Sequence, residues 1–448
     1  MRFETVLIAN RGEIALRTIE ACRELGLRSV AVYSEADAAM PYLELADASV
    51  CVGPAEPSKS YRNIAAIISA AELTGADAVH PGYGFLAENP HFVEVCEDHD
   101  LVFVGPSKET MQLVGNKQAA RETVVQAGVP VLPGADAPED GEALLAGAEE
   151  IGYPLLLKAV YGGGGRGMRY VSSPDEIVAL AAGARAEAKA ASGDASLYLE
   201  QALLAPRHVE VQVFADAGGA AVHLGERECS IQRRHQKMIE EAPAPQLDDE
   251  LRRHLHEAAI VAVRATAYRN AGTVEFLVGE DGSFYFVEMN ARIQVEHPVS
   301  EAVTGTNLIR TQLEIAAGES LRWRQEEIEI RGHAIECRLT AEDPGRGFAP
   351  SCGTVQIHEL PGGNGVRLDT AMVAGMVVSP HYDSLLAKII TWGREREEAR
   401  VRMLTALERF RISGIETTRE FLHDVVSDAA FRRGEITTDL VDRLLGAG

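Results

Sequence analysis

The clearest structural signal in the chain is the stretch FYFVEMNARIQVEHP, residues Phe284–Pro298. Its aromatic and apolar beginning follows the turn residues Asp281-Gly282 and predicts a buried strand. Its second part places polar side chains at every other position, namely Glu288, Asn290, Arg292, Gln294 and Glu296. Because alternate side chains of an extended chain point to one face, we expect all of these groups to line a single face.

A second apolar run lies just upstream, at Gly272–Val278, and carries Glu275. A short glycine-containing turn joins the two runs, so we expect a hairpin that holds Glu275 and Glu288 side by side. Two carboxylates and an asparagine oxygen are ligands that Mg²⁺ prefers, and Mg²⁺ usually accompanies the phosphates of a substrate. A sheet with one solvated face is the alternative, and the Val-Glu-His-Pro that follows makes it the weaker interpretation.

Glycines are concentrated in GGGGRG, Gly162–Gly167, between the predicted strands Pro154–Lys158 and Met168–Val171. A P-loop would require Lys-Ser/Thr after the glycines and then a helix, whereas Met168 follows here. A hairpin that closes over phosphates fits better, because glycine lets backbone N–H groups approach anionic oxygens. Lys158 enters this loop and is placed to neutralise phosphate charge. A glycine linker without a ligand is the alternative.

The N-terminal part of the chain alternates between predicted strands, at residues 4–9, 29–34, 76–80 and 101–104, and predicted helices, at 14–25 and 64–73. This alternation predicts an open parallel α/β sheet. A Rossmann dinucleotide site is not expected, because Asn10-Arg11-Gly12-Glu13 does not match G-x-G-x-x-G. The loop HPGYGFLAEN, His80–Asn89, follows a strand end, where open α/β sheets bind ligands, and Tyr83 at its tip is placed to pack against a flat ligand.

The composition excludes several classes of protein. The chain of 448 residues has a formal net charge of -24, from Lys+Arg 43 against Asp+Glu 67, and its length suggests about three domains. We expect no binding to nucleic acid or to a membrane, so any phosphate site must be built locally from a few basic groups. The 6 cysteines include no C-x-x-C pair, and no signal peptide or long apolar run is present, so we expect free thiols in a cytoplasmic protein.

Three long motifs carry a family resemblance: EMNARIQVEHP, HPGYGFLAEN and IQRRHQKMIEEAPAP, the last at Ile231–Pro245. Together they resemble biotin carboxylases of the ATP-grasp superfamily, and the similarity runs from about Val6 to the C-terminal region. The resemblance implies a mixed α/β and α+β architecture with three domains. These are an N-terminal open parallel α/β domain at residues 1–114, an ATP-grasp domain at 115–330 with a mobile lid at about 131–203, and a β-rich C-terminal domain at 331–448.

The resemblance also implies roles for individual residues. It implies ATP contacts at Lys117, Lys158, Gly163, Gly164, Gly165, Met168, Glu200, Gln201, Leu203, His208, Gln232, His235 and Leu277. The metal, Mg²⁺ or Mn²⁺, would bind Glu275, Glu288 and Asn290. Bicarbonate would bind Lys237, Arg292, Gln294 and Val295, and biotin would contact Tyr83 and Arg338. The catalytic groups would be Glu296 as general base on bicarbonate, together with Arg292, Arg338 and Lys237.

The implied reaction is the carboxylation of biotin with ATP and bicarbonate through carboxyphosphate, the first half-reaction of an acetyl-CoA or acyl-CoA carboxylase. Biotin would arrive on a carrier protein rather than on this chain, since no lysine here follows a methionine. A carboxyltransferase and a second copy of the chain are the other implied partners. Two departures from the family pattern are Val160-Tyr161 before only four glycines, where Ala-Ser and five are usual, and Gln201, where lysine is common.

Several alternatives stay open from the sequence. The chain could be a component of pyruvate carboxylase or another carboxylase, as a separate subunit or an excised domain. It could be another bicarbonate-using ATP-grasp ligase. It could also be a regulatory nucleotide-binding protein without catalysis, although the intact acidic and basic residues of Phe284–Pro298 argue against this.

Overall fold

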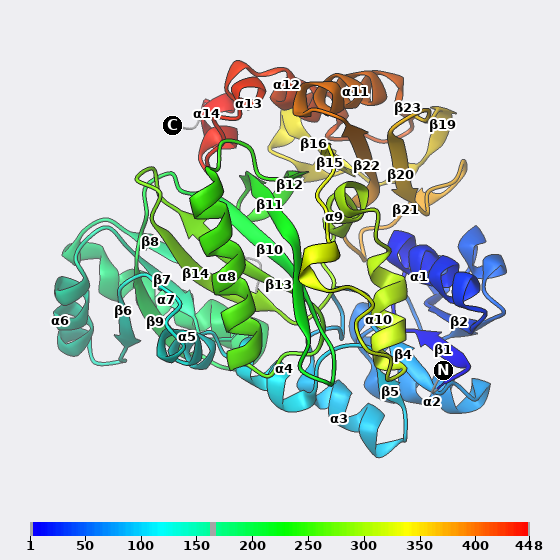
Figure 1. Cartoon of the computed structure of the whole chain (residues 1–448), viewed down its shortest axis with the longest axis horizontal. Coiled ribbons are helices and arrows are strands. Elements are labelled where there is room, and N and C mark those ends of the chain that lie inside the picture. Colours follow the sequence, from blue (N-terminus) through cyan, green and yellow to red (C-terminus); the bar gives the residue numbers. More distant parts are fainter. Residues whose placement is uncertain (1–2, 162–166, 447–448) are drawn as a thin grey trace.

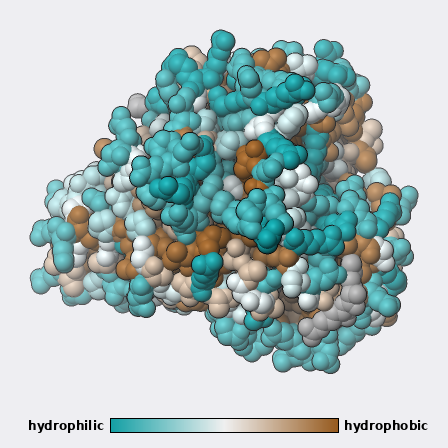
Figure 2. All heavy atoms as spheres, viewed as in Figure 1, coloured by the Kyte–Doolittle hydropathy of each residue, from teal (hydrophilic) through white to brown (hydrophobic). Residues whose placement is uncertain are grey.

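The structure is a computed structural model that describes residues 3–161 and 167–446 (Figure 1). The predicted ATP contacts at Gly163, Gly164 and Gly165 lie outside the described residues. Within the described ranges, no helix is both long and apolar enough to cross a membrane. The six cysteines are all unpaired, as expected. Figure 2 shows that hydrophilic side chains cover most of one face of the molecule, with apolar side chains in scattered groups.

The N-terminal segment forms the predicted parallel sheet, with strand order β3-β2-β1-β4-β5 and every neighbouring pair parallel. Asparagines begin two of its helices, because their side chains accept hydrogen bonds from the free N–H groups of the first turn. The elements are β1 (Thr5–Ile8), α1 (Gly12–Leu25), β2 (Arg28–Tyr33), β3 (Ala48–Cys51), α2 (Ile64–Thr74), β4 (Ala78–His80), α3 (Pro90–Asp98), β5 (Val102–Phe103) and α4 (Lys108–Gly115).

The ends of the adjacent strands β1 and β4 are tied together by Asn10. Its side-chain amide donates to the carbonyls of Pro81, at 2.6 Å, and Tyr83, at 2.7 Å. Gly82 between them has φ +61°, and a Cβ there would lie 2.8 Å from the Asn10 amide nitrogen. Only glycine fits this turn, which holds Tyr83 at the carboxyl edge of the sheet.

The described part of the segment that the resemblance assigns to a lid forms a four-stranded antiparallel sheet, order β6-β9-β7-β8, packed against two helices. Strands β7 and β8 form the predicted hairpin around the glycine stretch. Tyr161 is one of the residues that differ from the usual family sequence. Its hydroxyl accepts a hydrogen bond from the side-chain amide of Asn116 at 2.8 Å, and Asn116 directly precedes α5. The elements are α5 (Lys117–Gln126), β6 (Gly134–Ala137), α6 (Gly141–Ile151), β7 (Leu155–Ala159), β8 (Arg169–Val171), α7 (Pro174–Ser192) and β9 (Leu197–Gln201).

One eight-stranded sheet, order β14-β13-β10-β11-β12-β15-β22-β20, joins the centre of the chain to its C-terminal part. Strand β15 pairs directly with β12, so the proposed boundary near residue 331 lies within a shared sheet. The elements are β10 (Arg207–Ala215), β11 (Ala221–Arg233), β12 (Gln236–Ala242), α8 (Asp249–Ala265), β13 (Asn270–Val278), β14 (Phe284–Asn290), α9 (His297–Thr304), α10 (Leu308–Ala316), β15 (His333–Thr340), β20 (Val366–Thr370) and β22 (Leu385–Gly393).

The C-terminal part adds short strands and a group of helices at one end of the molecule, yellow through orange to red in Figure 1. Helices α11 and α12 bury Met403, Leu407, Leu422 and Val425 against β15 and β22. The elements are β16 (Glu342–Asp343), β17 (Ala349–Pro350), β18 (Gly353–Thr354), β19 (Gln356–Glu359), β21 (Val377–Val378), α11 (Arg396–Arg409), β23 (Arg411–Ser413), α12 (Arg419–Ser427), α13 (Ala429–Arg433) and α14 (Leu440–Leu444).

Candidate active site

A cavity of about 1150 Å³ lies where the N-terminal segment, the lid, the eight-stranded sheet and the C-terminal part meet. Among the described residues, every sequence-predicted site residue lines it except Glu200 and Gln201. Glu200 is buried beside it and holds Lys158 at 2.6 Å and Arg121 at 3.1 Å. Glu200 therefore orients Lys158, the lysine predicted to bind phosphate, and does not itself line the cavity.

The acidic hairpin forms as expected. Strands β13 and β14 are antiparallel, and Glu275 lies directly opposite Glu288. The side-chain nitrogen of Asn290 donates to Glu275 Oε1 at 2.8 Å. The side chain of Glu288 is paired with the ammonium group of Lys117, the first residue of α5. The two carboxylates therefore share one face of the hairpin. Glu275 accepts from the amide of Asn290, and Glu288 pairs with the ammonium of Lys117.

The prediction of an extended chain through Glu296 was wrong. Strand β14 ends at Asn290, and the chain turns before α9 begins at His297, with Pro298 in the first turn of that helix. Proline is favoured in a first helical turn, where no N–H donor is needed, and this sets the helix start. Arg292, Gln294 and Glu296 reach the cavity from this connection.

Lys237 on β12 is the centre of the acidic side of the cavity. Its ammonium group contacts carboxylates on three different segments, Glu210 on β10, Glu275 at 2.9 Å and Glu296 at 2.7 Å. Burial alone would lower the pKa of Lys237, but these carboxylates raise it well above its ordinary value. The ammonium is therefore a permanent charge that holds three buried acids together.

Glu296 is fully buried, at 0% exposure. Burial alone would raise its pKa, but Lys237, Arg338 and Arg227 together lower the pKa below its ordinary value. Arg338 donates to Glu296 Oε2 at 2.8 Å and also pairs with Glu240. Glu296 is thus a buried carboxylate that stays ionised at neutral pH and can accept a proton from a bound acid, although the charges that keep it ionised also make it a weaker base.

Arg227 supports this group from within the sheet. Its fully buried guanidinium donates to Glu210 at 2.6 Å and to Gln212 at 2.7 Å. It also donates to Ser300 at 2.9 Å and Thr273 at 3.0 Å. Because a buried charge is tolerated only when it is paired and hydrogen-bonded, this network fixes the position of Glu210 beneath Lys237.

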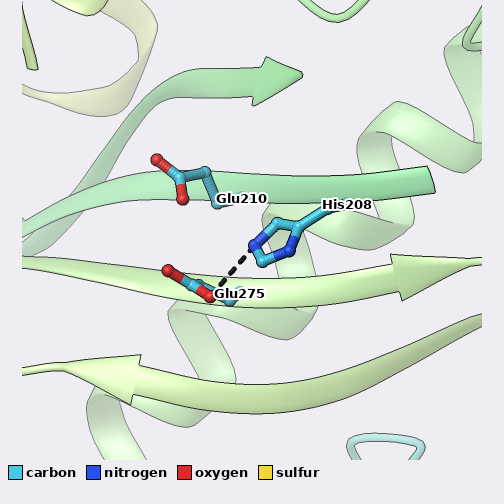
Figure 3. A group of neighbouring side chains, drawn as sticks. All are labelled: His208, Glu210 and Glu275. Carbon is cyan, nitrogen blue, oxygen red and sulfur yellow. Dashed lines mark ion pairs between the residues drawn. The ribbon is translucent and has the colours of Figure 1, made fainter. Parts of the chain in front are cut away.

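A second candidate ligand group consists of His208 and Glu210 on β10 and Glu275 on the adjacent strand β13 (Figure 3). The imidazole of His208 points toward Glu275, and its Nε2 lies 2.9 Å from Glu275 Oε2. Burial alone would lower the pKa of His208, but Glu275 raises it. Lys237 pairs with both Glu210 and Glu275. The trio therefore already has a cation among its carboxylates.

The basic hairpin between β11 and β12 turns through Arg234 and His235. Both residues have positive φ, 48° and 63°, as a two-residue type I′ turn requires. Neither is glycine, so this turn holds backbone conformations that most side chains avoid. It places His235 at the cavity, beside Gln232 and Lys237 on the adjoining strands.

Tyr83 lines the cavity, and its hydroxyl donates to Glu13 at the start of α1. Lys388 lies behind this pair, 3.1 Å from Glu13, and donates to the carbonyl of Val295 at 3.1 Å. Burial raises the pKa of Tyr83 well above its ordinary value. Tyr83 is therefore a neutral, anchored ring at the edge of the cavity, connected through Lys388 to the segment that carries Glu296.

Sequence reasoning missed two residues of the site, Glu210 and Glu88. Glu210 is a fully buried acid in an apolar strand and lies opposite Glu275. Its place in the alternation His208-x-Glu210-x-Gln212 was a usable signal. Glu88, inside HPGYGFLAEN, accepts from Arg292 Nε at 3.0 Å. No local sequence pattern around Glu88 indicates its contact with Arg292, which lies 204 residues later in the chain.

Comparison with known proteins identifies relatives along the whole chain. Residues 2–111 match the family described as biotin carboxylase, N-terminal domain, and residues 336–443 match biotin carboxylase C-terminal domain. Residues 116–324 match carbamoyl-phosphate synthase L chain, ATP binding domain. The biotin carboxylase of Pseudomonas aeruginosa is 53% identical over 445 residues, which is 99% of each chain.

Solved structures agree with this similarity. A biotin carboxylase–β,γ-ATP complex from Campylobacter jejuni has TM-score 0.96 and 46% identity, over 98% of this chain and 99% of that one. The biotin carboxylase domain dimer of Hydrogenobacter thermophilus 2-oxoglutarate carboxylase, in complex with MgADP, ADP and bicarbonate, also has TM-score 0.96. Its identity is 45%, over 99% of this chain and 98% of that one.

Proposed function

The chain belongs to the biotin carboxylase family and is an ATP-dependent biotin carboxylase, and from this premise we propose how its residues divide the work. The observation that carries the proposal is the buried Glu296 carboxylate, held by Lys237 and Arg338 at one end of a large cavity. Bicarbonate is a weak nucleophile, so the site must both hold it and remove its proton.

The nucleotide occupies the side of the cavity nearest the lid. Lys117 and Lys158 neutralise the phosphates, and Leu203, Leu277 and Met168 supply apolar contacts for the base. Glu200 and Gln201 support this end, with His208, Gln232 and His235 on the opposite wall. Because Lys117 now pairs with Glu288, the approach of phosphates draws the ammonium away from that carboxylate.

The residues of the acidic hairpin suit a magnesium ion. Glu275 and Glu288 present oxygens from paired positions, and rotation of the Asn290 amide exchanges its nitrogen for an oxygen beside Glu275. When bound, the metal would offset charge on the transferring phosphoryl group. Mn²⁺ has the same ligand preference and would serve in its place.

Bicarbonate lies between Arg292, Gln294, Lys237 and the backbone of Val295. Arg292 Nη1 donates to Gln294 Oε1 at 2.8 Å, so the guanidinium is oriented before the anion arrives. Glu296 takes the proton of bicarbonate while a bicarbonate oxygen attacks the γ-phosphorus of ATP. The bond from that phosphorus to the bridging oxygen breaks, which yields ADP and carboxyphosphate.

Carboxyphosphate then breaks down to carbon dioxide and phosphate. The phosphate takes the proton of the biotin ureido nitrogen, and the nitrogen attacks carbon dioxide to form carboxybiotin. Arg338 stabilises the negative charge that develops on the ureido oxygen, as donors in an oxyanion hole do. Tyr83 packs at the biotin edge of the cavity.

The test is ADP release by the purified chain with ATP and Mg²⁺, with and without bicarbonate and free biotin. We expect turnover to depend on bicarbonate and to rise with biotin. Turnover that needs bicarbonate and ignores biotin would instead indicate a sister ATP-grasp ligase. ATP binding without turnover, even with a biotinylated carrier protein, would indicate a regulatory protein.

The metal assignment makes a separate prediction. Glu288→Gln should raise the Mg²⁺ concentration for half-maximal ADP release by at least about tenfold, since loss of even an outer partner of a metal site weakens binding by that much. Glu280→Gln, at an exposed position in the same hairpin, is the matched control and should leave the Mg²⁺ requirement unchanged. Equal Mg²⁺ curves for both variants would refute the assignment.

We further propose that the chain acts in the cytoplasm as a homodimer, with a biotin carboxyl carrier protein and a carboxyltransferase. The six free thiols support a reducing compartment. Acetyl-CoA or another acyl-CoA is the proposed final acceptor, and pyruvate or 2-oxoglutarate is the alternative. Reconstitution with the carrier and carboxyltransferase, offering each acceptor in turn, separates these cases, and light scattering gives the oligomeric state.

A further inference from the structure

Arg338 is shared unequally between two buried carboxylates. Its Nε donates to Glu240 Oε1 at 2.6 Å, and its Nη2 lies 2.5 Å from the same oxygen. Nη2 also donates to Glu296 Oε2 at 2.8 Å. Nη1 donates no hydrogen bond to any residue that the structure describes. Glu240 thus occupies the edge of the guanidinium formed by Nε and Nη2, and the Nη1 group is left for a ligand.

The geometry of this pair is set by the sheet. Glu240 on β12 lies opposite Glu336 on β15, and Arg338 follows two residues later on the same face of β15. Both glutamates have 0% exposure. Side chains on neighbouring strands of a central sheet move little, so Glu240 can hold the guanidinium in one orientation.

Glu336, the other carboxyl group beside Glu240, does not compete for Arg338. Neither carboxyl oxygen of Glu336 has a hydrogen-bond partner among the described residues. Burial raises the pKa of Glu336 well above its ordinary value, which favours the neutral acid. The charged groups that face the Glu240–Glu336 pair are Arg338, Lys237, Glu296 and Lys388, and of these Arg338 is the one that Glu240 contacts.

We propose that Glu240 is a positioning residue for the biotin half-reaction. It draws the guanidinium of Arg338 away from Glu296 and leaves Nη1 directed at the ureido oxygen. This rests on the proposed function, because it assumes that Arg338 contacts biotin. Without Glu240, the guanidinium would pair fully with Glu296, and the ureido oxygen would lose its preorganised donor.

The experiment compares Glu240→Gln with wild type in two assays of ADP release at saturating ATP and Mg²⁺. One assay uses bicarbonate alone, and the other adds increasing free biotin. Hydrogen bonds to charged groups are strong enough that we expect about a tenfold loss in kcat/KM for biotin. ADP release with bicarbonate alone should fall less than kcat/KM for biotin, because the groups that hold bicarbonate and the nucleotide are unchanged and only the pairing of Glu296 with Arg338 differs.

Glu226→Gln is the matched control. Glu226 is buried on β11 of the same sheet and accepts from Arg252 Nε at 2.9 Å, but it does not line the cavity. Its replacement removes a comparable buried arginine pair and should leave both assays within about twofold. Melting temperatures of all variants show whether each is folded.

A double-mutant cycle decides whether Glu240 acts through Arg338. On an Arg338→Gln background, Glu240→Gln should cause no further loss in kcat/KM for biotin. If Glu240→Gln does not fold, Glu240→Asp takes its place, since it keeps the charge but shortens the reach, and a smaller loss confined to biotin is expected. Equal losses in both assays, additive losses in the cycle or an unchanged kcat/KM would each overturn the proposal. Absence of biotin stimulation in wild type would instead overturn the proposed function.

Discussion

Glu296→Gln is expected to lower biotin-dependent ADP release by about a hundredfold to ten-thousandfold, the range typical of a lost general base. Glutamine has nearly the same shape, but it is neutral and cannot accept the proton of bicarbonate. The native carboxylate lies 2.7 Å from Lys237 and 2.8 Å from Arg338, and these charges keep it ionised. The measurement is ADP release with saturating ATP, Mg²⁺, bicarbonate and biotin.

A buried glutamate elsewhere controls for the loss of a paired charge. Glu314 on α10 is buried and lies 2.8 Å from Arg310 and 2.7 Å from Arg322, outside the cavity. Glu314→Gln should retain turnover within a few-fold of wild type. ATP binding by the Glu296 variant, measured by calorimetry, should be nearly unchanged. A fall in turnover of less than about tenfold would remove Glu296 from the role of base.

Lys237→Met is expected to have the largest effect on stability at the site. Breaking a buried ion pair by removing one partner costs about 3–5 kcal/mol, because the remaining charge stays buried without compensation. Here the ammonium serves Glu210, Glu275 and Glu296 together. We expect the free energy of unfolding at pH 7, measured by urea titration, to fall by about that amount.

The same variant has a predictable dependence on pH. In the native protein, Lys237 and its neighbours overcome the effect of burial and lower the pKa of Glu275 and Glu296. Acids with a depressed folded pKa contribute stability above their unfolded pKa of about 4.3 and lose it as the pH falls through the folded value. Without Lys237, burial is opposed only by the remaining cations, Arg338 and Arg227 at Glu296 and His208 at Glu275, so both pKa values rise and the ionised acids contribute less stability at neutral pH.

The stability deficit of Lys237→Met should therefore be greatest at pH 7 and shrink as the pH is lowered toward 5. Urea titrations at both values measure it. Lys108→Met removes a partly exposed lysine that pairs with the exposed Glu94, and this control should change stability little at either pH. A deficit that is the same at pH 5 and pH 7 would show that Lys237 contributes through packing rather than through charge.

The local sequence pattern was sufficient to predict those elements whose residues are close together in the chain. The alternation of strands and helices predicted the parallel N-terminal sheet, and two apolar runs around a short turn predicted the hairpin that pairs Glu275 with Glu288. Both follow from periodicity and turn chemistry, which act over a few residues. The glycine hairpin between β7 and β8 was predicted on the same basis.

Periodicity failed where the chain changed from strand to helix. The two-residue spacing from Glu288 to Glu296 is compatible with an extended chain, but β14 ends at Asn290 because α9 begins at His297. The site residues of this segment still reach one cavity. Their convergence therefore depends on the position of α9 over the sheet and cannot be derived from the spacing of polar residues.

The motifs alone determined the family, the acidic hairpin and the identity of most groups that line the cavity. The order of strands in the eight-stranded sheet decided which of these groups touch. It brings Lys237 on β12 to Glu210 and Glu275 on β10 and β13, and it places Glu240 beside Arg338 on β15. The ionisation of Glu296, the anchoring of Arg338 and the raised pKa of Glu336 arise from burial and from charges contributed by distant segments, and these interactions exist only in the folded chain.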